Sequence, residues 1–376
     1  MYEFELGPIR PPSEAQSILL RITRNCPWNK CAFCPVYKNE KFSLRTLEEI
    51  KGDIDSMYGI YSKIKEKASF NTGGYVSDEI ISSLINDDKI PQHYLQQMLF
   101  WMYYGLKSLF LQDADSMVVK SDDMVEILNY IKQKFPMIDR ITCYSRSKTL
   151  VVKTLVELKR IRAAGLNRIH IGMESGSDEV LKLIRKGVTG AEHITAGRNV
   201  VEAGFELSEY FMPGLGGKKF TVENAAETAK VLNAVNPAFI RIRTTTSVPG
   251  TELFKMMERG EWEPLTEKEK VEELRNMIED LEGITSYIQS DHMMNLIEDS
   301  NGKFPEDKDK ILAPLNKFLD MSLDDQECFI VARRTGRIRF LSDYSRNKDF
   351  IELRDMIKER FGSIDKAAAA LSANSL

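Results

Sequence analysis

The chain of 376 residues has little of several features that define whole classes of protein. It contains five cysteines, and its 56 acidic residues are nearly balanced by 52 lysines and arginines. An odd number of cysteines, three of them crowded near the N-terminus, does not fit the disulfide framework of a small secreted domain. The near-balance of charge argues against a protein whose main task is to coat nucleic acid.

Long apolar segments and targeting signals are also missing. The first sixteen residues have neither a basic start nor an apolar stretch, so we expect no signal peptide. The most apolar segment, 94–111, is interrupted by Gln96, Gln97, Gly105 and Lys107, whereas a bilayer span needs ~20 mostly apolar residues. This segment therefore predicts a buried helix followed by a strand. A soluble, cytoplasmic protein without a membrane partner is expected.

What the sequence does contain is an alternation of short apolar runs and longer amphipathic patterns. The runs predict strands at 17–22, 109–112, 140–144, 168–172, 207–212 and 239–243, and the patterns predict helices at 46–60, 122–134, 150–164, 177–186, 191–203 and 222–235. Strict alternation predicts a parallel sheet covered by helices. Six such units are too few for a closed eight-stranded barrel. The expected fold class is α/β, a partial (β/α)6 TIM-like barrel with active groups at the C-terminal ends of its strands.

The sequence pattern changes after the sixth strand, and we place a domain boundary near residue 260. The expected organisation is a lead-in at 1–16, the partial barrel at 17–260 and a smaller, mainly helical region at 261–376. After the sixth strand, helices are expected at 252–260, 267–284, 307–319 and 348–361, and the alanine-rich tail from 367 is expected to be a frayed end. Residues 70–93 form an insertion, either a surface excursion or a lid or substrate loop.

A cluster of cysteines follows the first predicted strand. Cys26, Cys31 and Cys34 have the spacing C-x4-C-x2-C, and such a loop can turn three sulfurs toward one point, as iron–sulfur and zinc sites do. Structural zinc takes four protein ligands, but the next cysteine is Cys143 and the first histidine is His93. Three thiolates instead fit a cubane cluster that keeps one iron open. The alternative is three unligated, buried cysteines.

With its aromatic residue before the last cysteine, this loop resembles the cluster loop of radical SAM enzymes, although the commonest spacing there is C-x3-C-x2-C. The segments FLQDADSM, IHIGMESGSDEVLKLIRKGVT, YFMPGLGG and TSVPGTELF follow in the order of that superfamily's barrel motifs. The resemblance covers about residues 17–255, and SDHMMN and KFPEDKDKIL are similar to the C-terminal part of the same uncharacterised branch. The core is similar to that of Elp3 and of the oxygen-independent coproporphyrinogen oxidases.

The resemblance implies an enzyme with a single [4Fe–4S] cluster on Cys26, Cys31 and Cys34 and with S-adenosyl-L-methionine (SAM) as its second cofactor. Reductive cleavage of SAM then gives a 5′-deoxyadenosyl radical that abstracts hydrogen from an unknown, small-molecule substrate. An electron donor such as flavodoxin or ferredoxin is implied, and the reaction class (oxidoreductase, lyase or transferase) stays open. No second cysteine-rich group and no N-terminal cobalamin domain are expected.

A different class of function competes with this interpretation. A non-catalytic iron–sulfur or zinc module that binds a partner or nucleic acid would need a fourth ligand or a basic face. The sequence offers neither a local fourth ligand nor a basic run, so a nucleic-acid partner is not expected.

Cofactor contacts are implied at the ends of several strands. By resemblance, Phe33 lies beside the adenine, or it only fills the barrel mouth. Asp113 or Asp115 meets the methionyl ammonium, although the glycines typical of that turn are missing, or serves as a helix N-cap. Glu174 accepts the ribose hydroxyls. The remaining candidates are Ser145 and Arg146 (for SAM or substrate), Met212, Gly214 and Pro249.

Other charged and sulfur-containing residues have open roles. Arg185 or Lys186 reaches the SAM carboxylate, or both lie on a solvated face. Asp291 and His292 are weak candidates for action on substrate, because a lone histidine often satisfies only a local hydrogen bond. Cys143 and Cys328 are expected to pack in the core.

Overall fold

The computed structural model describes residues 2–72, 76–85 and 89–373. Its main feature is an eight-stranded sheet with the strand order β1-β4-β5-β6-β7-β8-β9-β10. The strands are β1 (Ile18–Arg21), β4 (Ser108–Gln112), β5 (Arg140–Ser145), β6 (Leu166–Glu174), β7 (Glu206–Phe211), β8 (Phe239–Ile242), β9 (Tyr287–Gln289) and β10 (Gly302–Lys303). A separate two-stranded ladder joins β2 (Thr23–Arg24) and β3 (Ser43–Leu44).

The six predicted strands are confirmed, and β9 and β10 extend the sheet beyond them. The pairs β1–β4, β4–β5, β7–β8 and β8–β9 are parallel, and β10 runs antiparallel to β9. Within the part of the chain that is described, the strand order is linear and β1 does not pair with β10. The α/β class and the incomplete barrel are therefore confirmed.

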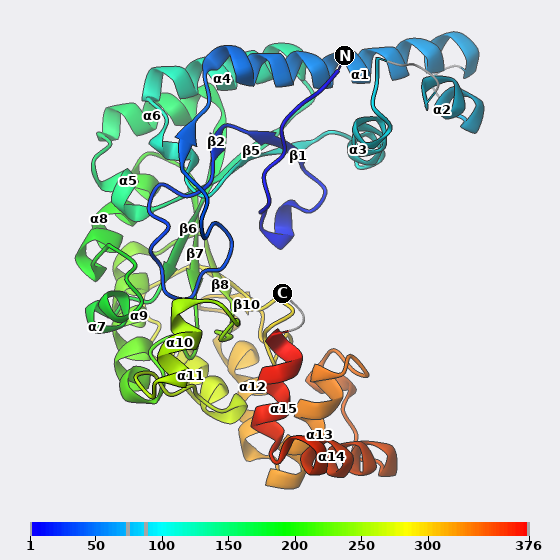
Figure 1. Cartoon of the computed structure of the whole chain (residues 1–376). Coiled ribbons are helices and arrows are strands. Elements are labelled where there is room, and N and C mark those ends of the chain that lie inside the picture. The colour runs from blue at the N-terminus through cyan, green and yellow to red at the C-terminus, as the bar shows by residue number, and fades with distance from the viewer. Residues whose placement is uncertain (1, 73–75, 86–88, 374–376) are drawn as a thin grey trace. The chain divides into compact units, whose positions relative to one another are not determined.

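Helices follow the strands and make up the C-terminal region (Figure 1). They are α1 (Leu47–Thr72), α2 (Asp78–Ile85), α3 (Gln92–Tyr103), α4 (Ser121–Lys134), α5 (Ser147–Val151), α6 (Leu155–Ala164), α7 (Asp178–Leu183), α8 (Gly190–Glu202), α9 (Thr221–Val235), α10 (Glu252–Glu258), α11 (Glu267–Glu279), α12 (Lys308–Asp320), α13 (Leu323–Arg334), α14 (Lys348–Phe361) and α15 (Ile364–Ala373). The apolar segment 94–111 forms a helix and a strand, as predicted, but the helix is buried on one face only: Leu95, Met98 and Trp101 are buried, whereas Phe100 and Tyr103 are exposed.

The first helix is longer than predicted, because its apolar stripe does not stop at Ile60. Ile64 and Ala68 continue the stripe and are fully buried, so α1 runs to Thr72. Part of the insertion at 70–93 is therefore helical, in α1, α2 and the start of α3, while 73–75 and 86–88 lie outside the described residues. Its role as a lid or a surface excursion stays a prediction.

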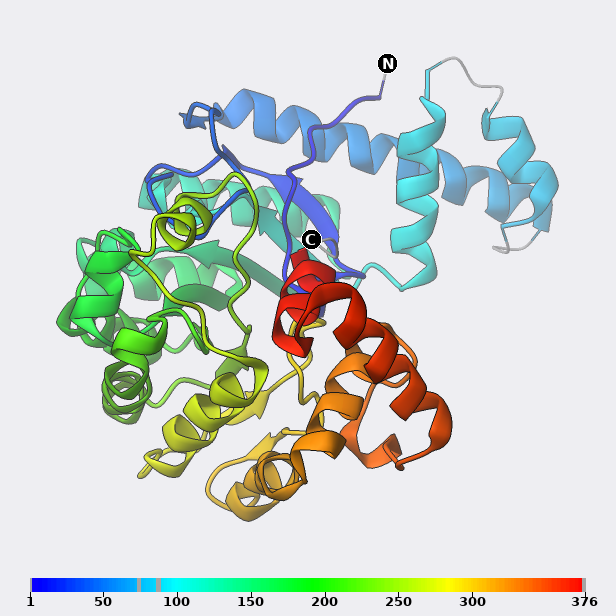
Figure 2. The same cartoon turned by 60° about the horizontal axis from the view of Figure 1, so that its bottom comes forward.

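The expectation of a frayed alanine-rich tail is wrong as far as the described residues reach. α15 continues to Ala373, and Ile364, Ala367 and Ala368 are buried. Alanine has the highest intrinsic helix propensity, and a packed face stabilises such a short helix. Figure 2 shows α15 against α14, and α15 also contacts α13.

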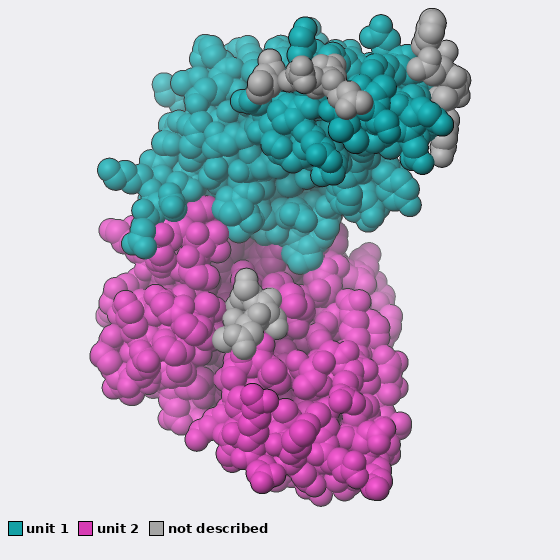
Figure 3. Space-filling view, turned by 45° about the vertical axis from the view of Figure 1, so that its right-hand side comes forward, with its two compact units in different colours: residues 1–27, 39–170, 202–205 teal, residues 28–38, 171–201, 206–376 magenta. Residues whose placement is uncertain are grey.

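The chain divides into two compact units, which are coloured in Figure 3. The first comprises residues 1–27, 39–170 and 202–205, and the second comprises 28–38, 171–201 and 206–376. In the first unit α1 lies beside α4 (Figure 1), and Lys51 of α1 is 2.6 Å from Glu126 of α4. The boundary near residue 260 stays a prediction. No helix among the described residues is long and apolar enough to cross a bilayer.

Candidate cofactor site

The cysteine loop follows β2, and its three cysteines are half-buried and free of disulfides. The amide of Cys34 donates to the carbonyl of Cys31 at 3.4 Å, which gives this part of the loop a tight turn. Within the described residues, no group of three or more Cys, His, Asp or Glu side chains is arranged to hold a metal ion. The donor chemistry and the C-x4-C-x2-C spacing still fit an iron–sulfur cluster. Cys143 and Cys328 are buried, as predicted.

The second half of the loop is anchored within the second unit. Trp28 donates its indole N–H to the carbonyl of Arg185 at 2.7 Å, and the amide of Ala32 donates to the carbonyl of Ile184 at 2.8 Å. Gly187 has a φ of +73°, and a Cβ there would lie 2.3 Å from the Trp28 ring. The close approach of the indole therefore requires glycine at this position.

The same connection carries an ion pair at the end of β6. Glu174 has a φ of +68°, and its Oε1 lies 3.0 Å from the Nζ of Lys186. The ammonium of Lys186 is 5.8 Å from the centroid of the Phe33 ring. A Cβ at Gly172 would lie 2.3 Å from Glu174 Oε1 and 3.1 Å from Lys186 Nζ, so glycine makes room for the pair.

This geometry distinguishes the two downstream cations by their burial. Lys186 is only 8% exposed and faces Glu174, so it does not lie on a solvated surface. The Arg185 side chain is 61% exposed and 3.9 Å from Glu252. Of the two, Lys186 is the one that joins a predicted site residue.

A further carboxyl group, which the sequence reading missed, lies on β7. Glu209 is buried, and its Oε2 has no hydrogen-bond partner among the described residues. Burial, reinforced by the charge of Glu174, raises the pKa of Glu209 well above its usual value, and Lys186 only partly opposes this. The surroundings of Glu209 therefore favour its protonated form, which can donate a hydrogen bond, whereas the Glu174 carboxylate accepts one from Lys186. The signal in the sequence that could have singled out Glu209 was a carboxylate inside an otherwise buried strand.

The first unit places two predicted aspartates in fixed contacts. Asp113 is buried and accepts hydrogen bonds from Arg21 at 2.7 and 2.9 Å and from the amide of Asn25 at 3.2 Å. Arg21 thus neutralises this carboxylate, which could otherwise meet a ligand cation.

Asp115, Ser145 and Arg146 lie together at the ends of β4 and β5. The Asp115 carboxylate accepts from the Ser145 hydroxyl at 2.9 Å, the Arg146 amide at 3.3 Å and the Thr149 hydroxyl at 2.5 Å. Burial raises the pKa of Asp115. Ser145 ends β5, and Arg146 and Thr149 lie at the start of α5, so Asp115, in the loop after β4, ties the end of β5 to α5. Asp115 is also the N-cap residue of the short 3-10 helix Ser116–Val118, but its side chain makes no cap hydrogen bond there.

The glycine turn after β7 is held from the C-terminal region. Gly214 has a φ of +84°, and its amide donates to Glu273 Oε1 at 2.7 Å. Glu273 also accepts from Asn224 at 2.7 Å and from Thr221 at 2.6 Å. Burial raises the pKa of Glu273 to about 7. This buried carboxyl on α11 therefore fixes the turn that contains Met212 and Gly214.

Residues 99–232, a range that includes β4 to β7, match the family model of the Radical SAM superfamily. This part of the chain is similar to the domain of that superfamily. The matched residues contain Glu174, Lys186 and Glu209 and begin after the cysteine loop. The resemblance inferred from the motifs is confirmed, and the expected cofactors, a [4Fe–4S] cluster and SAM, agree with it. The domain supports an enzyme, and it does not distinguish among the three reaction classes.

Two curated archaeal proteins are similar to about two thirds of this chain. A tRNA uridine(34) acetyltransferase of Methanocaldococcus infernus is 23% identical over 261 residues, which cover 66% of this chain and 46% of the relative. Its counterpart in Methanocaldococcus jannaschii is 22% identical over 261 residues, which cover 66% of this chain and 45% of the relative. The chain thus spans about half the length of these curated relatives. Because they are named for tRNA, the expectation of no nucleic-acid partner has lost its support.

Solved structures give weaker likenesses. The Methanocaldococcus infernus Elp3 structure has a TM-score of 0.41 and 19% identity, covering 53% of this chain and 52% of that one. Methylornithine synthase has a TM-score of 0.43 and 14% identity, covering 90% and 85%. Scores this low carry no argument about activity.

Two other predicted residues lie in the C-terminal region. Asp291 accepts from Gln289 at 2.7 Å and from Arg241 at 3.3 Å. The Nδ1 of His292 accepts from the amide of Met294 at 3.2 Å, and burial, helped by the charge of Arg243, lowers the pKa of His292 to about 4. His292 is therefore neutral at pH 7. A catalytic role for either residue stays a prediction.

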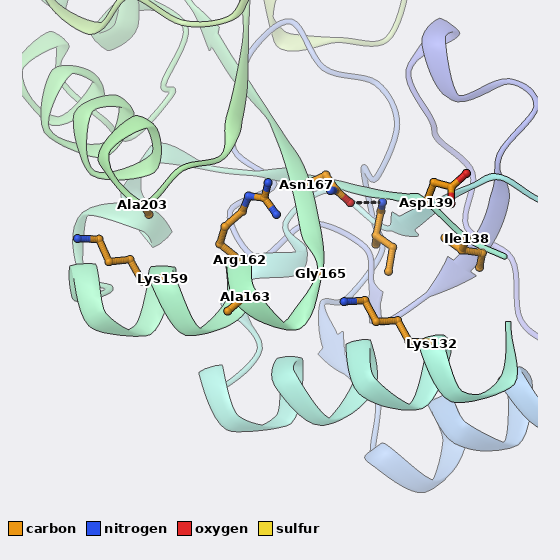
Figure 4. Close-up of a pocket in the computed structure, with 10 residues that line it drawn as sticks. Lys132, Ile138, Asp139, Lys159, Arg162, Ala163, Gly165, Asn167 and Ala203 are labelled. Atoms are coloured by element: carbon orange, nitrogen blue, oxygen red, sulfur yellow. Dashed lines mark hydrogen bonds between the residues drawn. The ribbon is translucent and has the colours of Figure 1, made fainter. Parts of the chain in front are cut away.

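A cationic cavity lies on the first unit, at the N-terminal ends of β5 and β6 (Figure 4). Its volume is about 450 Å³, and Lys132, Lys159 and Arg162 line it. Arg162 is fixed by a 2.7 Å hydrogen bond from its Nε to the carbonyl of Gly204. Active sites of α/β folds form at the opposite, C-terminal ends of strands, so this cavity is not part of the cofactor site. Its cations suit an anionic group.

The raised pKa of Glu273 predicts a pH-dependent stability. Because folding favours the protonated form, its contribution is complete below the usual value of 4.5 and is lost as pH rises through about 7. In Glu273→Gln the amide oxygen can still accept from Gly214 and Asn224, and the amide N–H can donate to Thr221. At about pH 8 this variant should therefore exceed the wild type in free energy of unfolding by on the order of 3 kcal/mol.

Urea unfolding of both proteins across that pH range measures the difference. The advantage of the variant should shrink toward about pH 4, where the wild-type carboxyl is protonated. Glu279→Gln, an exposed site on the same helix, is the matched control and should show no such trend. A pH-independent gap between wild type and Glu273→Gln would contradict the assignment.

Proposed function

We propose that this chain is a radical SAM enzyme that uses a single [4Fe–4S] cluster on Cys26, Cys31 and Cys34. It cleaves SAM reductively to a 5′-deoxyadenosyl radical, which abstracts hydrogen from the substrate. The observation that carries the proposal is the buried Glu174–Lys186 ion pair beside Phe33, on the strand end where the motif series predicts the cofactor. The match of residues 99–232 to the superfamily supports it.

Each of these side chains offers SAM a different kind of contact. The Glu174 carboxylate can accept hydrogen bonds from ribose hydroxyls, and the Lys186 ammonium can pair with the methionyl carboxylate. The Phe33 ring can cover the adenine. When bound, the cluster supplies the electron that breaks a carbon–sulfur bond of the sulfonium. The chain itself binds SAM, orients it and shields it from water.

Anaerobic reconstitution with iron and sulfide tests the proposal. With SAM and dithionite, the protein should show broad visible iron–sulfur absorbance and form 5′-deoxyadenosine, measured by liquid chromatography and mass spectrometry. Omission of dithionite should remove the product. A fully loaded protein that forms none would overturn the proposed reaction.

The substrate is either a small molecule or tRNA, and two observations favour including tRNA. The archaeal relatives are named tRNA uridine(34) acetyltransferases, and the cavity with Lys132, Lys159 and Arg162 offers cations to phosphate. The same assay separates the two classes: transcribed tRNA should stimulate cleavage of SAM and carry a new mass if it is the substrate. A small-molecule enzyme would show neither effect.

A further inference from the structure

The cavity lined by Lys132, Lys159 and Arg162 carries an excess of positive charge. Its one described acidic lining residue is Asp139, whose carboxylate pairs at 3.4 Å with Lys107, which lies outside the lining. Among the described residues, no carboxylate forms an ion pair with Lys132, Lys159 or Arg162. The three cations of the cavity are therefore available to an anion that enters it.

The fold places these cations at the cavity. Arg162 donates from Nε to the carbonyl of Gly204 at 2.7 Å, which fixes the guanidinium and leaves its two terminal nitrogens without a hydrogen bond to a described residue. Lys132 reaches from α4 over the glycine that ends α6, since a Cβ at Gly165 would lie 2.4 Å from its Nζ. Lys159 precedes Arg162 by three residues on α6, so both lie on one face of that helix (Figure 4). The cavity thus presents cations whose positions exist before a ligand binds.

A cluster of exposed aromatic rings lies at the C-terminal end of α3. Phe100, Tyr103 and Tyr104 are 41%, 83% and 40% exposed. The centroid of the Tyr104 ring lies 5.0 Å from that of Phe100 and 5.1 Å from that of Tyr103. Large rings that gather on a protein surface in this way are typical of interaction sites.

The aromatic cluster and the cavity adjoin along one edge of the first unit. Lys107 follows Tyr104 by three residues and directly precedes β4. The amide of Asp139, just before β5, donates to the carbonyl of Lys107 at 2.9 Å, and Asp139 lines the cavity. Lys107 therefore lies between the rings and the cations, at the N-terminal ends of neighbouring parallel strands.

We propose that this edge binds a single strand of RNA, with phosphates on Lys132, Lys159 and Arg162 and bases stacked on Tyr103 and Tyr104. Proteins that bind single strands combine cations along the backbone with aromatic rings under the bases. The surface lies at the opposite ends of the strands from the cofactor site, so it holds RNA and takes no part in the chemistry. The inference rests on the tRNA alternative of the proposed function and names a surface for it.

The probe is a fluorescein-labelled oligouridylate of about twelve nucleotides, whose binding to the full chain is measured by fluorescence anisotropy at about 50 mM salt. Binding should be saturable and should weaken steeply as the salt concentration rises, because each neutralised phosphate releases counterions. The double variant Lys132→Gln/Lys159→Gln should bind about tenfold more weakly. Its slope of log affinity against log salt should be shallower by about 1.4.

The aromatic cluster has a different signature. Tyr103→Ala removes the most exposed ring and should weaken binding about fivefold or more, with no change in the salt slope. Tyr103→Phe keeps the ring and should bind as the wild type does. The control Lys182→Gln/Lys255→Gln removes two exposed lysines, from α7 and α10, and should change neither affinity nor slope. Circular dichroism melting should show that every variant is folded, since all the exchanged residues are exposed.

Several results would overturn the proposal. The wild type must bind the oligouridylate, and Lys132→Gln/Lys159→Gln must bind it more weakly than the control double variant. Wild-type affinity in Tyr103→Ala would exclude stacking. Polyglutamate tests an acidic protein as the partner: displacement of the probe by polyglutamate as effective as by unlabelled oligouridylate would exclude a surface specific for RNA. The assay needs neither cluster nor SAM, so its failure would leave the radical SAM reaction standing, and a failed SAM-cleavage assay would leave RNA binding standing.

Discussion

Replacement of any one of Cys26, Cys31 and Cys34 with alanine is expected to abolish both the visible iron–sulfur absorbance and the formation of 5′-deoxyadenosine. Three thiolates are the minimum that holds a cubane cluster with one open iron, so two cannot substitute for them. The loss should be complete and not graded, because SAM cleavage needs the electron that only the assembled cluster supplies. Iron and sulfide content, measured with the product assay, reports both effects.

Cys143→Ala and Cys328→Ala are the matched controls. Both residues are fully buried, so each variant should lose about 1 kcal/mol of unfolding free energy through a small cavity. Cluster content and product should persist. A Cys31→Ala protein that keeps its full iron and its product would show that the loop is not the ligand set. Loss of the cluster in Cys143→Ala at unchanged stability would show that the three cluster ligands are assigned to the wrong cysteines.

Most of the sheet could be predicted from the sequence because buried parallel strands read as continuous apolar runs. Each of the six predicted strands overlaps an observed one. β9 and β10 have three and two residues, and Tyr287 in β9 is exposed, so neither leaves a readable run. α13 was missed for the opposite reason. Its residues 328–332 are all buried, and such a continuous buried run shows no amphipathic period in that part of the helix.

The candidate site was predictable only where it lies in motifs. Glu174 and the cysteines follow predicted strands, so their order along the chain was enough to single them out. The pairing of Lys186 with Glu174 could not be predicted. It depends on the positive φ of Glu174 and on the missing Cβ of Gly172, and a pattern of residues reveals neither. Glu273 lies 59 residues from the Gly214 amide that it accepts from. Long-range contacts of this kind depend on how the C-terminal helices pack, which periodicity does not determine.

Lys186→Met is expected to separate the ion pair's structural role from its role toward SAM. The pair is nearly closed to water, with side chains 11% and 12% exposed. Removing the ammonium leaves the Glu174 carboxylate beside Glu209 without a cation. Breaking buried pairs costs 3–5 kcal/mol, so we expect a loss of about 2–4 kcal/mol in unfolding free energy. The dissociation constant for SAM should rise about tenfold or more, since its carboxylate loses a charged donor.

The double variant Glu174→Gln/Lys186→Met decides between the two roles. Without the carboxylate no charge is left unpaired, so most of the lost stability should return, while SAM binding should stay weak. Urea unfolding measures the first effect, and isothermal titration of the reconstituted protein with SAM measures the second. Lys182→Met, an exposed lysine on α7, should change neither. If the double variant regained stability and SAM affinity together, Lys186 would only be the counter-ion of Glu174, and the cation that receives the SAM carboxylate would lie elsewhere in the chain.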